Sequence, residues 1–225
     1  MVRELRAAVV YLTGFGDRAA LDPETTARGG AFFPVLGLAL GGIAALAARE
    51  GAALVPDGGG AAVGLAALVL LVRAAPLRAV ARGAGALAAV ALLALELGAL
   101  WVVVPSALGP SLALAGMLGR WAFVVQAYGS TPARPDGIGA AFTRAMQFRE
   151  FGLASVSAMA LTLLLADAVG LVLLLWTATQ TIALRILVHG RKGGVGETSL
   201  AAGAALAEAS TLLLCAALAR LLTTG

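Results

Sequence analysis

Residues 152–188 read GLASVSAMALTLLLADAVGLVLLLWTATQTIALRILV, and Asp167 and Arg185 are the only charged side chains in this stretch. A helix needs roughly 20 predominantly apolar residues to cross the hydrocarbon core of a bilayer. The stretch has room for two such helices with only Asp167 between them, so we expect a tight turn at this residue. A chain that carries such a stretch is predicted to be an integral membrane protein.

The same kind of apolar stretch recurs along the chain. Of its 225 residues, 60% are hydrophobic and 12% are charged, whereas about 25% of the residues of a typical soluble domain are charged. We therefore predict an all-α fold, a polytopic membrane helix bundle that forms a single integral membrane domain over residues 1–225, with about seven transmembrane helices. A short interfacial helix is expected before them, from Val2 to about Phe15, because apolar residues are mixed there with Arg3 and Arg6. The candidate spans are residues 31–48, 59–72, 84–104, 107–126, 152–166, 168–188 and 199–222.

The basic residues of the loops predict the orientation of the bundle. Cytoplasmic loops keep an excess of Lys and Arg, and here these residues fall before the first candidate span and in every second loop after it. We expect a multi-pass protein of the cell membrane with a cytoplasmic N-terminus and a C-terminus outside. The pI near 10.2 then reflects topology and attraction to anionic lipids and substrates, and no nucleic acid partner is expected. The basic residues are Arg3, Arg6, Arg18, Arg28, Arg73, Arg78, Arg82, Arg134, Arg144, Arg149, Arg191 and Lys192.

Four charged residues lie well within candidate spans. A charge at such a depth costs at least about 2.5–3.5 kcal/mol and is usually paired or functional. Glu96 and Arg120 lie deep in neighbouring spans, and we interpret them as a structural ion pair. Glu208 in the last span is expected to face the same interior. Arg185 is about one turn from the inner face, so its side chain is expected to reach the interface.

Four short blocks carry the strongest functional signal. They are residues 28–38 (RGGAFFPVLGL), 119–121 (GRW), 133–139 (ARPDGIG) and 193–198 (GGVGET). In their order and spacing these blocks resemble the motifs of cobalamin synthases, the adenosylcobinamide-GDP ribazoletransferase family. The resemblance runs over nearly the whole chain.

The resemblance implies a membrane enzyme that joins adenosylcobinamide-GDP to α-ribazole or its 5′-phosphate, forms adenosylcobalamin or its phosphate, and releases GMP. It also implies a divalent cation, usually Mg²⁺. The lipid bilayer is an expected partner. The resemblance leaves open two further partners, a second copy of the chain and other proteins of the corrinoid pathway. Carried over to this sequence, the catalytic acid is Glu208, a remnant of the family's late acidic residues. The substrate-binding residues are Arg28, Phe33, Pro34, Arg120, Arg134, Gly137, Gly193 and Gly194.

The sequence departs from the family pattern where the family carries its acids. The acidic run His-Leu-Asp-Gly-Leu-Ala-Asp is replaced by residues 72–82, VRAAPLRAVAR, and no Asp or Glu occurs between Asp57 and Glu96. Near the end of the chain, Thr198 and Ala205 stand where relatives carry an aspartate and a glutamate. The metal ligands are therefore unknown, because a hard cation would find too few carboxylates. The inner-face candidates that remain are Asp136, Glu150 and Glu197.

Two other functions stay open. A catalytically degenerate relative would bind a corrinoid or a phosphorylated ligand without turnover, or would support another membrane enzyme. A small transporter would use Glu96 and Arg120 as ligands in the middle of the membrane. Residues 192–199 also look like a phosphate-binding loop, but Glu197 stands where such a loop has its lysine, so we do not expect nucleotide hydrolysis. The loop at 127–151 is expected either to close over a phosphate or to form a solvated amphipathic helix.

Overall fold

The computed structural model describes residues 1–17, 20–55, 58–135 and 137–222. The described chain is built almost entirely of helices, as the hydropathy pattern predicts, and the prediction of an all-α membrane-type bundle is confirmed. In chain order the elements are α1 (Val2–Thr13), α2 (Pro23–Gly29), the short 3-10 helix η1 (Gly30–Phe32), α3 (Phe33–Leu54), α4 (Gly59–Leu71), α5 (Ala75–Ala84), α6 (Ala86–Val102), α7 (Pro105–Ala127), α8 (Ile138–Ala145), α9 (Phe148–Lys192) and α10 (Glu197–Leu222).

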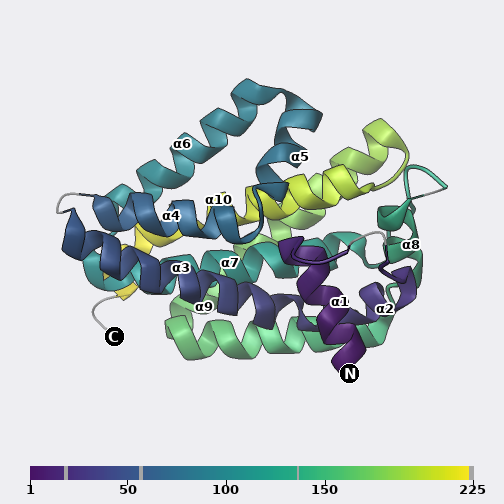
Figure 1. The fold of residues 1–225 in the computed structure, drawn as a ribbon, viewed down its shortest axis with the longest axis horizontal. Helices are drawn as coiled ribbons and strands as arrows, with labels where there is room; N and C mark the ends of the chain where they lie inside the picture. The colour runs from purple at the N-terminus through teal and green to yellow at the C-terminus, as the bar shows by residue number, and fades with distance from the viewer. Residues whose placement is uncertain (18–19, 56–57, 136, 223–225) are drawn as a thin grey trace.

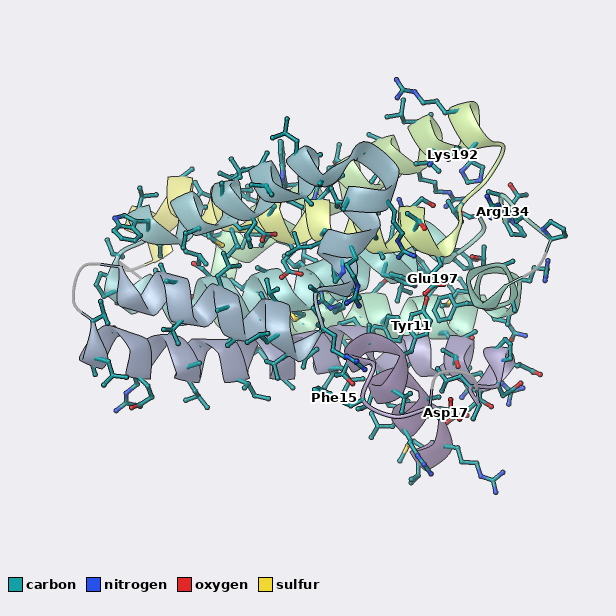
Figure 2. The ribbon with its side chains drawn as sticks, turned by 45° about the horizontal axis from the view of Figure 1, so that its top comes forward. Tyr11, Phe15, Asp17, Arg134, Lys192 and Glu197 are labelled. Atoms are coloured by element: carbon teal, nitrogen blue, oxygen red, sulfur yellow. The ribbon has the colours of Figure 1, made fainter. Side chains whose placement is uncertain are left out.

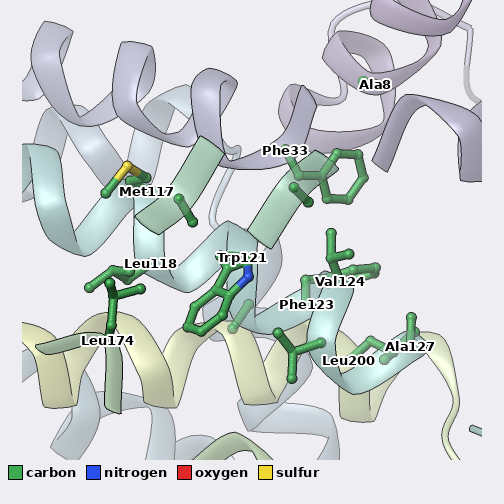
Figure 3. Packing of buried hydrophobic residues seen from close by; sticks show 14 of the residues in the cluster. Ala8, Phe33, Met117, Leu118, Trp121, Phe123, Val124, Ala127, Leu174 and Leu200 are labelled. Carbon is green, nitrogen blue, oxygen red and sulfur yellow. The ribbon is translucent and has the colours of Figure 1, made fainter. Parts of the chain in front are cut away.

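The central helix of the bundle is α7. Figure 1 shows α3, α4, α7, α9 and α10 side by side along the long axis of the molecule. Every residue of α7 from Ser111 to Ala127 is buried, which requires neighbours on all of its faces. Figure 3 shows part of this packing, in which Leu118 of α7 belongs to one apolar cluster with Leu174 of α9 and Leu200 of α10.

Glycines allow α3 to approach α7 closely. A Cβ added at Gly41 would overlap the carbonyl oxygen of Leu112 and lie 2.7 Å from the Cα of Ala113. A Cβ added at Gly116 would lie 2.7 Å from the carbonyl oxygen of Gly37. Small residues at helix contacts are typical of membrane bundles. These glycines therefore set the distance between the two helices.

Helix α9 folds back on itself at Asp167. The backbone of this residue is not helical, with φ 44° and ψ −133°. A Cβ added at Gly170 would lie 2.7 Å from the carbonyl oxygen of Thr162, whereas the same separation in a straight helix spans about 12 Å. The two halves of α9 are therefore antiparallel. The predicted tight turn between the candidate spans 152–166 and 168–188 is confirmed.

The number of seven transmembrane helices is not confirmed. By length and hydropathy, four helical stretches of the described chain are able to cross a membrane, or five if the bent pair of α4 and α5 forms one span. Helices α4 and α5 meet at 83°, and α6 is only 17 residues long. The folded-back α9 counts as a single stretch by this criterion. Seven apolar helical segments do lie at the predicted positions, but how many of them cross the bilayer stays a prediction.

Helix α1 closes one end of the bundle beside α2. Ala8 and Tyr11 on one face of α1 are buried, while Leu5 and Val9 on another face are exposed. The helix ends at Gly14, which takes the left-handed conformation with φ 69°. A short helix with one apolar face turned outward is what the sequence predicts for an interfacial helix. Its position in the bilayer stays a prediction.

Helix α2 is stabilised by its own side chains. Oδ2 of the N-cap residue Asp22 accepts hydrogen bonds from N (2.8 Å) and Oγ1 (2.6 Å) of Thr25. Because the Thr25 side chain and then its backbone N–H favour the ionised carboxylate, the pKa of Asp22 lies below its ordinary value. In the last turn, Arg28 pairs with Glu24 at 2.6 Å on the exposed surface. The guanidinium of Arg28 is thus engaged within its own helix.

The basic connections gather at one end of the bundle. In Figure 1, α1, α2, α8 and the connection between α9 and α10 lie at one end of the long axis. The last turn of α3, the first turn of α4 and the C-terminal end of α10 lie at the other end. The start of the chain and the end of α10 are thus at opposite ends of the bundle, as the loop charges predict. Which end faces the cytoplasm stays a prediction.

Candidate functional site

A basic cavity of about 430 Å³ lies where α5, the loop before α8, the end of α9 and the start of α10 meet. Its cationic side chains come from three of these segments, Arg82 on α5, Arg134 in the loop and Lys192 at the end of α9. Glu197 at the start of α10 is the carboxylate in its lining. Figure 2 shows Arg134, Lys192 and Glu197 at the same end of the bundle. We refer to this space as the basic cavity.

Two of the sequence blocks meet at the wall of the basic cavity. N of Val195 donates to the carbonyl oxygen of Thr131, and N of Ala133 donates to the carbonyl oxygen of Val195, both at 2.8 Å. A Cβ added at Gly194 would overlap the carbonyl oxygen of Thr131 and lie 2.8 Å from N of Ala133. A side chain at Gly194 would therefore separate the two loops. The block at 133–139 and the block at 193–198 form one structural unit.

The other predicted glycines turn the chain beside the basic cavity. Gly193 ends α9 with φ 69°, and Gly137 precedes α8 with φ 94°. Side chains other than glycine rarely adopt these angles. Gly137 lines the cavity, and its predicted contact with a substrate stays a prediction. Gly193 and Gly194 determine the shape of the loop in which Val195 and Gly196 line the basic cavity.

The start of α10 adds partial positive charge to the basic cavity. The first turn of a helix leaves backbone N–H groups without helical acceptors, and the helix dipole favours an anion there. N of Gly196 donates to Oγ of Ser199 at 2.8 Å, which fixes the turn just before the helix. Together with Arg82, Arg134 and Lys192, this helix start makes a cavity suited to phosphate oxygens.

Further loop contacts hold this end of the bundle in shape. Arg185 donates from Nη1 to the carbonyl oxygen of Tyr128 at 2.8 Å and from Nη2 to that of Gly129 at 2.6 Å. It thereby caps the end of α7, and its expected position at the membrane interface stays a prediction. Nε2 of His189 accepts a long bond of 3.4 Å from N of Thr131. His189 therefore supports the same loop.

An ion pair lies in the middle of the bundle. Nη1 of Arg120 donates to Oε2 of Glu208 at 2.6 Å, and the two residues are only 2% and 6% exposed. We expected Arg120 to pair with Glu96, so this expectation is corrected, since the helix packing brings α10 closer to the guanidinium. Glu96 on α6 is also buried and interacts electrostatically with both residues of the pair. The expectation that Glu208 faces the same interior is confirmed.

A second cavity of about 80 Å³ reaches Arg120 from the basic end of the bundle. Arg78 and Arg82 of α5 line it together with Arg120, Tyr11 and Glu197. Arg82 and Glu197 line the basic cavity as well. We refer to this smaller space as the arginine cavity. The two cavities are therefore neighbours that share one cation and one acid.

An apolar groove continues from the basic cavity along the helices. Its volume is about 480 Å³, and Leu92, Leu184 and Leu206 are among its lining residues. Lys192 and Thr198 line both this groove and the basic cavity. A ligand with an anionic part and a flat apolar part would find both environments side by side.

Three predicted substrate residues lie away from both the basic cavity and the arginine cavity. Arg28 is exposed and paired with Glu24, as described above. Phe33 is fully buried and stacks with Tyr11 and Phe142 at ring distances of 5.9 and 5.7 Å. Pro34 is buried in the first turn of α3. In this structure the three residues build the end of the bundle, and direct substrate contact by any of them stays a prediction.

The described acids do not form a metal site. Among the residues that the structure describes, no group of three or more His, Cys, Asp and Glu side chains is arranged to hold a metal ion. Glu150 is buried with its Oε1 3.9 Å from Nε of Arg149, and Glu208 is paired with Arg120, which leaves Glu197 as the acid at the basic cavity. Asp136 lies outside the described residues. The described side chains thus offer no three-ligand site for a cation, and a role for Mg²⁺ stays a prediction.

Comparison with known proteins gives one family. A family model described as cobalamin-5-phosphate synthase matches residues 77–218. The matched region runs from α5 to α10 and thus contains the basic cavity and all three arginines of the arginine cavity. No curated protein and no solved structure matches the chain.

Proposed function

Because the chain belongs to the cobalamin-5-phosphate synthase family, whose members act on corrinoids in cobalamin biosynthesis, we propose that it joins adenosylcobinamide-GDP to α-ribazole or its 5′-phosphate and releases GMP. The observation that carries the proposal is the basic cavity at the start of α10. A membrane protein needs such a cluster of cations to hold a diphosphate at the edge of the bilayer.

The release of GMP defines the bonds that change. GMP keeps one phosphorus, so a ribazole hydroxyl oxygen attacks the other phosphorus, on the cobinamide side of the diphosphate. The new P–O bond forms, the bond from that phosphorus to the bridging oxygen breaks, and the electron pair leaves with GMP. Arg82, Arg134 and Lys192 would balance the negative charge that grows on the bridging oxygen. Glu197 is the lining carboxylate that would accept the hydroxyl proton.

The apolar groove supports the choice of the acceptor. The benzimidazole base of α-ribazole is flat and largely apolar, whereas its phosphate and sugar are polar. Leu92, Leu184 and Leu206 would contact the base, while Lys192 at the junction would hold the phosphate. This placement would bring the ribose next to a phosphate of the diphosphate at the basic cavity.

Product formation by the purified chain tests this proposal. The protein in lipid nanodiscs is mixed with adenosylcobinamide-GDP and α-ribazole 5′-phosphate, with and without Mg²⁺, and GMP and the corrinoid product are measured by mass spectrometry. The Arg134→Ala change is expected to weaken substrate binding about tenfold or more, since a charge-assisted hydrogen bond contributes about 1.5–3 kcal/mol. Arg6→Ala is the matched control, because Arg6 is an exposed arginine of α1 outside the cavity lining. Absence of GMP under every condition would rule out the transferase.

A catalytically degenerate relative is the second candidate, and the scattered acids favour it. In that case adenosylcobinamide-GDP binds to the nanodisc-embedded protein, with the same loss of affinity in Arg134→Ala, but GMP does not form. Equilibrium dialysis of the substrate measures binding without any need for turnover. Binding without GMP would therefore select this candidate over the transferase.

A further inference from the structure

Among the described residues, the Arg120 guanidinium forms a hydrogen bond through only one of its two terminal nitrogens. Its Nη1 binds Glu208, but its Nη2 is buried and has no hydrogen-bond partner among the described residues. Buried donors are nearly always satisfied in folded proteins. Arg120 also lines the arginine cavity, so its cationic side chain adds to the positive charge around that space.

Helix α5 brings two more guanidinium groups to the arginine cavity. Arg78 and Arg82 are one helical turn apart and therefore lie on the same side of α5. The direction of α5 depends on the turn before it, where Arg73 and Ala74 both adopt the left-handed conformation with φ 51° and 52°. Two such residues in succession are unfavourable for side chains other than glycine. Such strain is often found at functional sites, and here it positions the arginines.

The size and position of the arginine cavity suggest its ligand. A volume of about 80 Å³ has room for a group of a few atoms but not for a nucleoside. Three arginines and one acid, Glu197, line the cavity, and Glu208 pairs with Arg120 beside it, so positive charge prevails. Because Arg82 and Glu197 also line the basic cavity, groups bound in the two cavities are close enough to be parts of one molecule. These features fit the two phosphates of a diphosphate.

We propose that the arginine cavity binds the second phosphate of a diphosphate ligand, while the basic cavity binds the first, and that this binding needs no metal ion. Guanidinium groups bind phosphate oxygens in pairs of parallel hydrogen bonds. Arg78 and Arg82 on α5 and Arg120 on α7 supply the positive charge at this cavity, so they balance the charge of the diphosphate without a metal ion. The identity of the diphosphate rests on the proposed function, but the cavity itself can be tested with inorganic pyrophosphate.

Calorimetric titration of the full chain in nanodiscs, with EDTA present, tests the proposal with inorganic pyrophosphate and inorganic phosphate as probes. Pyrophosphate is expected to bind at least tenfold more tightly than phosphate. Arg78→Ala is expected to weaken pyrophosphate about tenfold and phosphate less than twofold. Arg6→Ala, which changes an exposed arginine outside both cavities, is expected to change neither.

A second variant tests the role of Arg120. Arg120→Lys keeps the positive charge beside Glu208 but removes the planar group with its second donor. It is expected to reduce the preference for pyrophosphate over phosphate to less than threefold in protein with an unchanged helical circular dichroism spectrum. Equal binding of the two probes by the unchanged protein, a requirement for Mg²⁺, or equal effects of Arg78→Ala and Arg6→Ala would each overturn the proposal. Pyrophosphate binding as expected without any GMP formation would keep the arginine cavity and reject the transferase.

Discussion

Replacing Glu208 with leucine is expected to destabilise the protein by about 3–5 kcal/mol. The carboxylate accepts from Nη1 of Arg120 at 2.6 Å, and both residues are buried. The change leaves the charge of Arg120 in the interior without this partner, and removing one member of a buried ion pair has a cost of this size. Glu96 still lies within electrostatic reach of Arg120, so the loss is expected at the lower end of the range.

The reverse change is expected to cost more. Arg120→Leu leaves Glu208 and Glu96 together in the interior without the cation that faces both of them, so its effect is expected near the upper end, about 5 kcal/mol. Replacing both members of a buried pair by apolar residues is often neutral. The double variant Arg120→Leu with Glu208→Leu is therefore expected within about 2 kcal/mol of the unchanged protein. The two single changes should be strongly non-additive.

Unfolding in mixed micelles by increasing amounts of SDS, followed by tryptophan fluorescence, measures these differences. Glu50→Leu is the control, because Glu50 is an exposed acid on α3 and such changes usually stay within about 0.5 kcal/mol. A double variant as unstable as the sum of the two single variants would refute the reasoning. So would single variants that cost less than about 1 kcal/mol, because the pair would then be solvated.

The remaining predictions concern the backbone. Gly41→Ala should lower the thermal unfolding temperature clearly, because its Cβ overlaps α7, whereas Gly42→Ala, with no atom within 4 Å, should change it little; equal effects would contradict the close contact of α3 and α7. Ala74→Gly should leave the protein as stable or stabilise it by up to about 1 kcal/mol, because glycine tolerates the left-handed turn, and a clear loss of stability in the same assay would contradict it. The cap of α2 should be fully formed above the ordinary pKa of Asp22, 3.8, and should weaken as the pH falls below it, since a lowered pKa means stability lost on protonation. Hydrogen exchange at Thr25 that is insensitive to pH after correction for intrinsic rates would contradict this.

The features that depend on local patterns were predicted from the sequence. Apolar stretches of helical length predict the helix bundle. The single acid between two of these stretches predicts the turn at Asp167. The loop charges gave the gathering of the basic connections at one end. These properties follow from the cost of placing charge or unpaired backbone in lipid, which acts on each segment separately.

The features that depend on distant contacts were not predicted in full. The partner of Arg120 is 88 positions away in the sequence, and nothing in the local pattern distinguishes Glu208 from Glu96 for this role. From the sequence, Arg78 and Arg82 are interpreted as loop charges that determine topology. The direction of α5 depends on the left-handed conformation of Arg73 and Ala74, and no turn motif in the sequence predicts that conformation. The one-turn spacing of Arg78 and Arg82, next to the position of the family's acidic run, was the signal that could have assigned them to the site.

The hairpin at Asp167 has a consequence for biogenesis. When both halves of α9 cross the bilayer, the chain crosses it twice. The segment before α9 and the segment after it then lie in the same compartment. The two loops that are hydrogen-bonded at Thr131 and Val195 therefore lie in the same compartment whichever way the hairpin is inserted. The contact between these two loops thus does not require a particular orientation of the first helices.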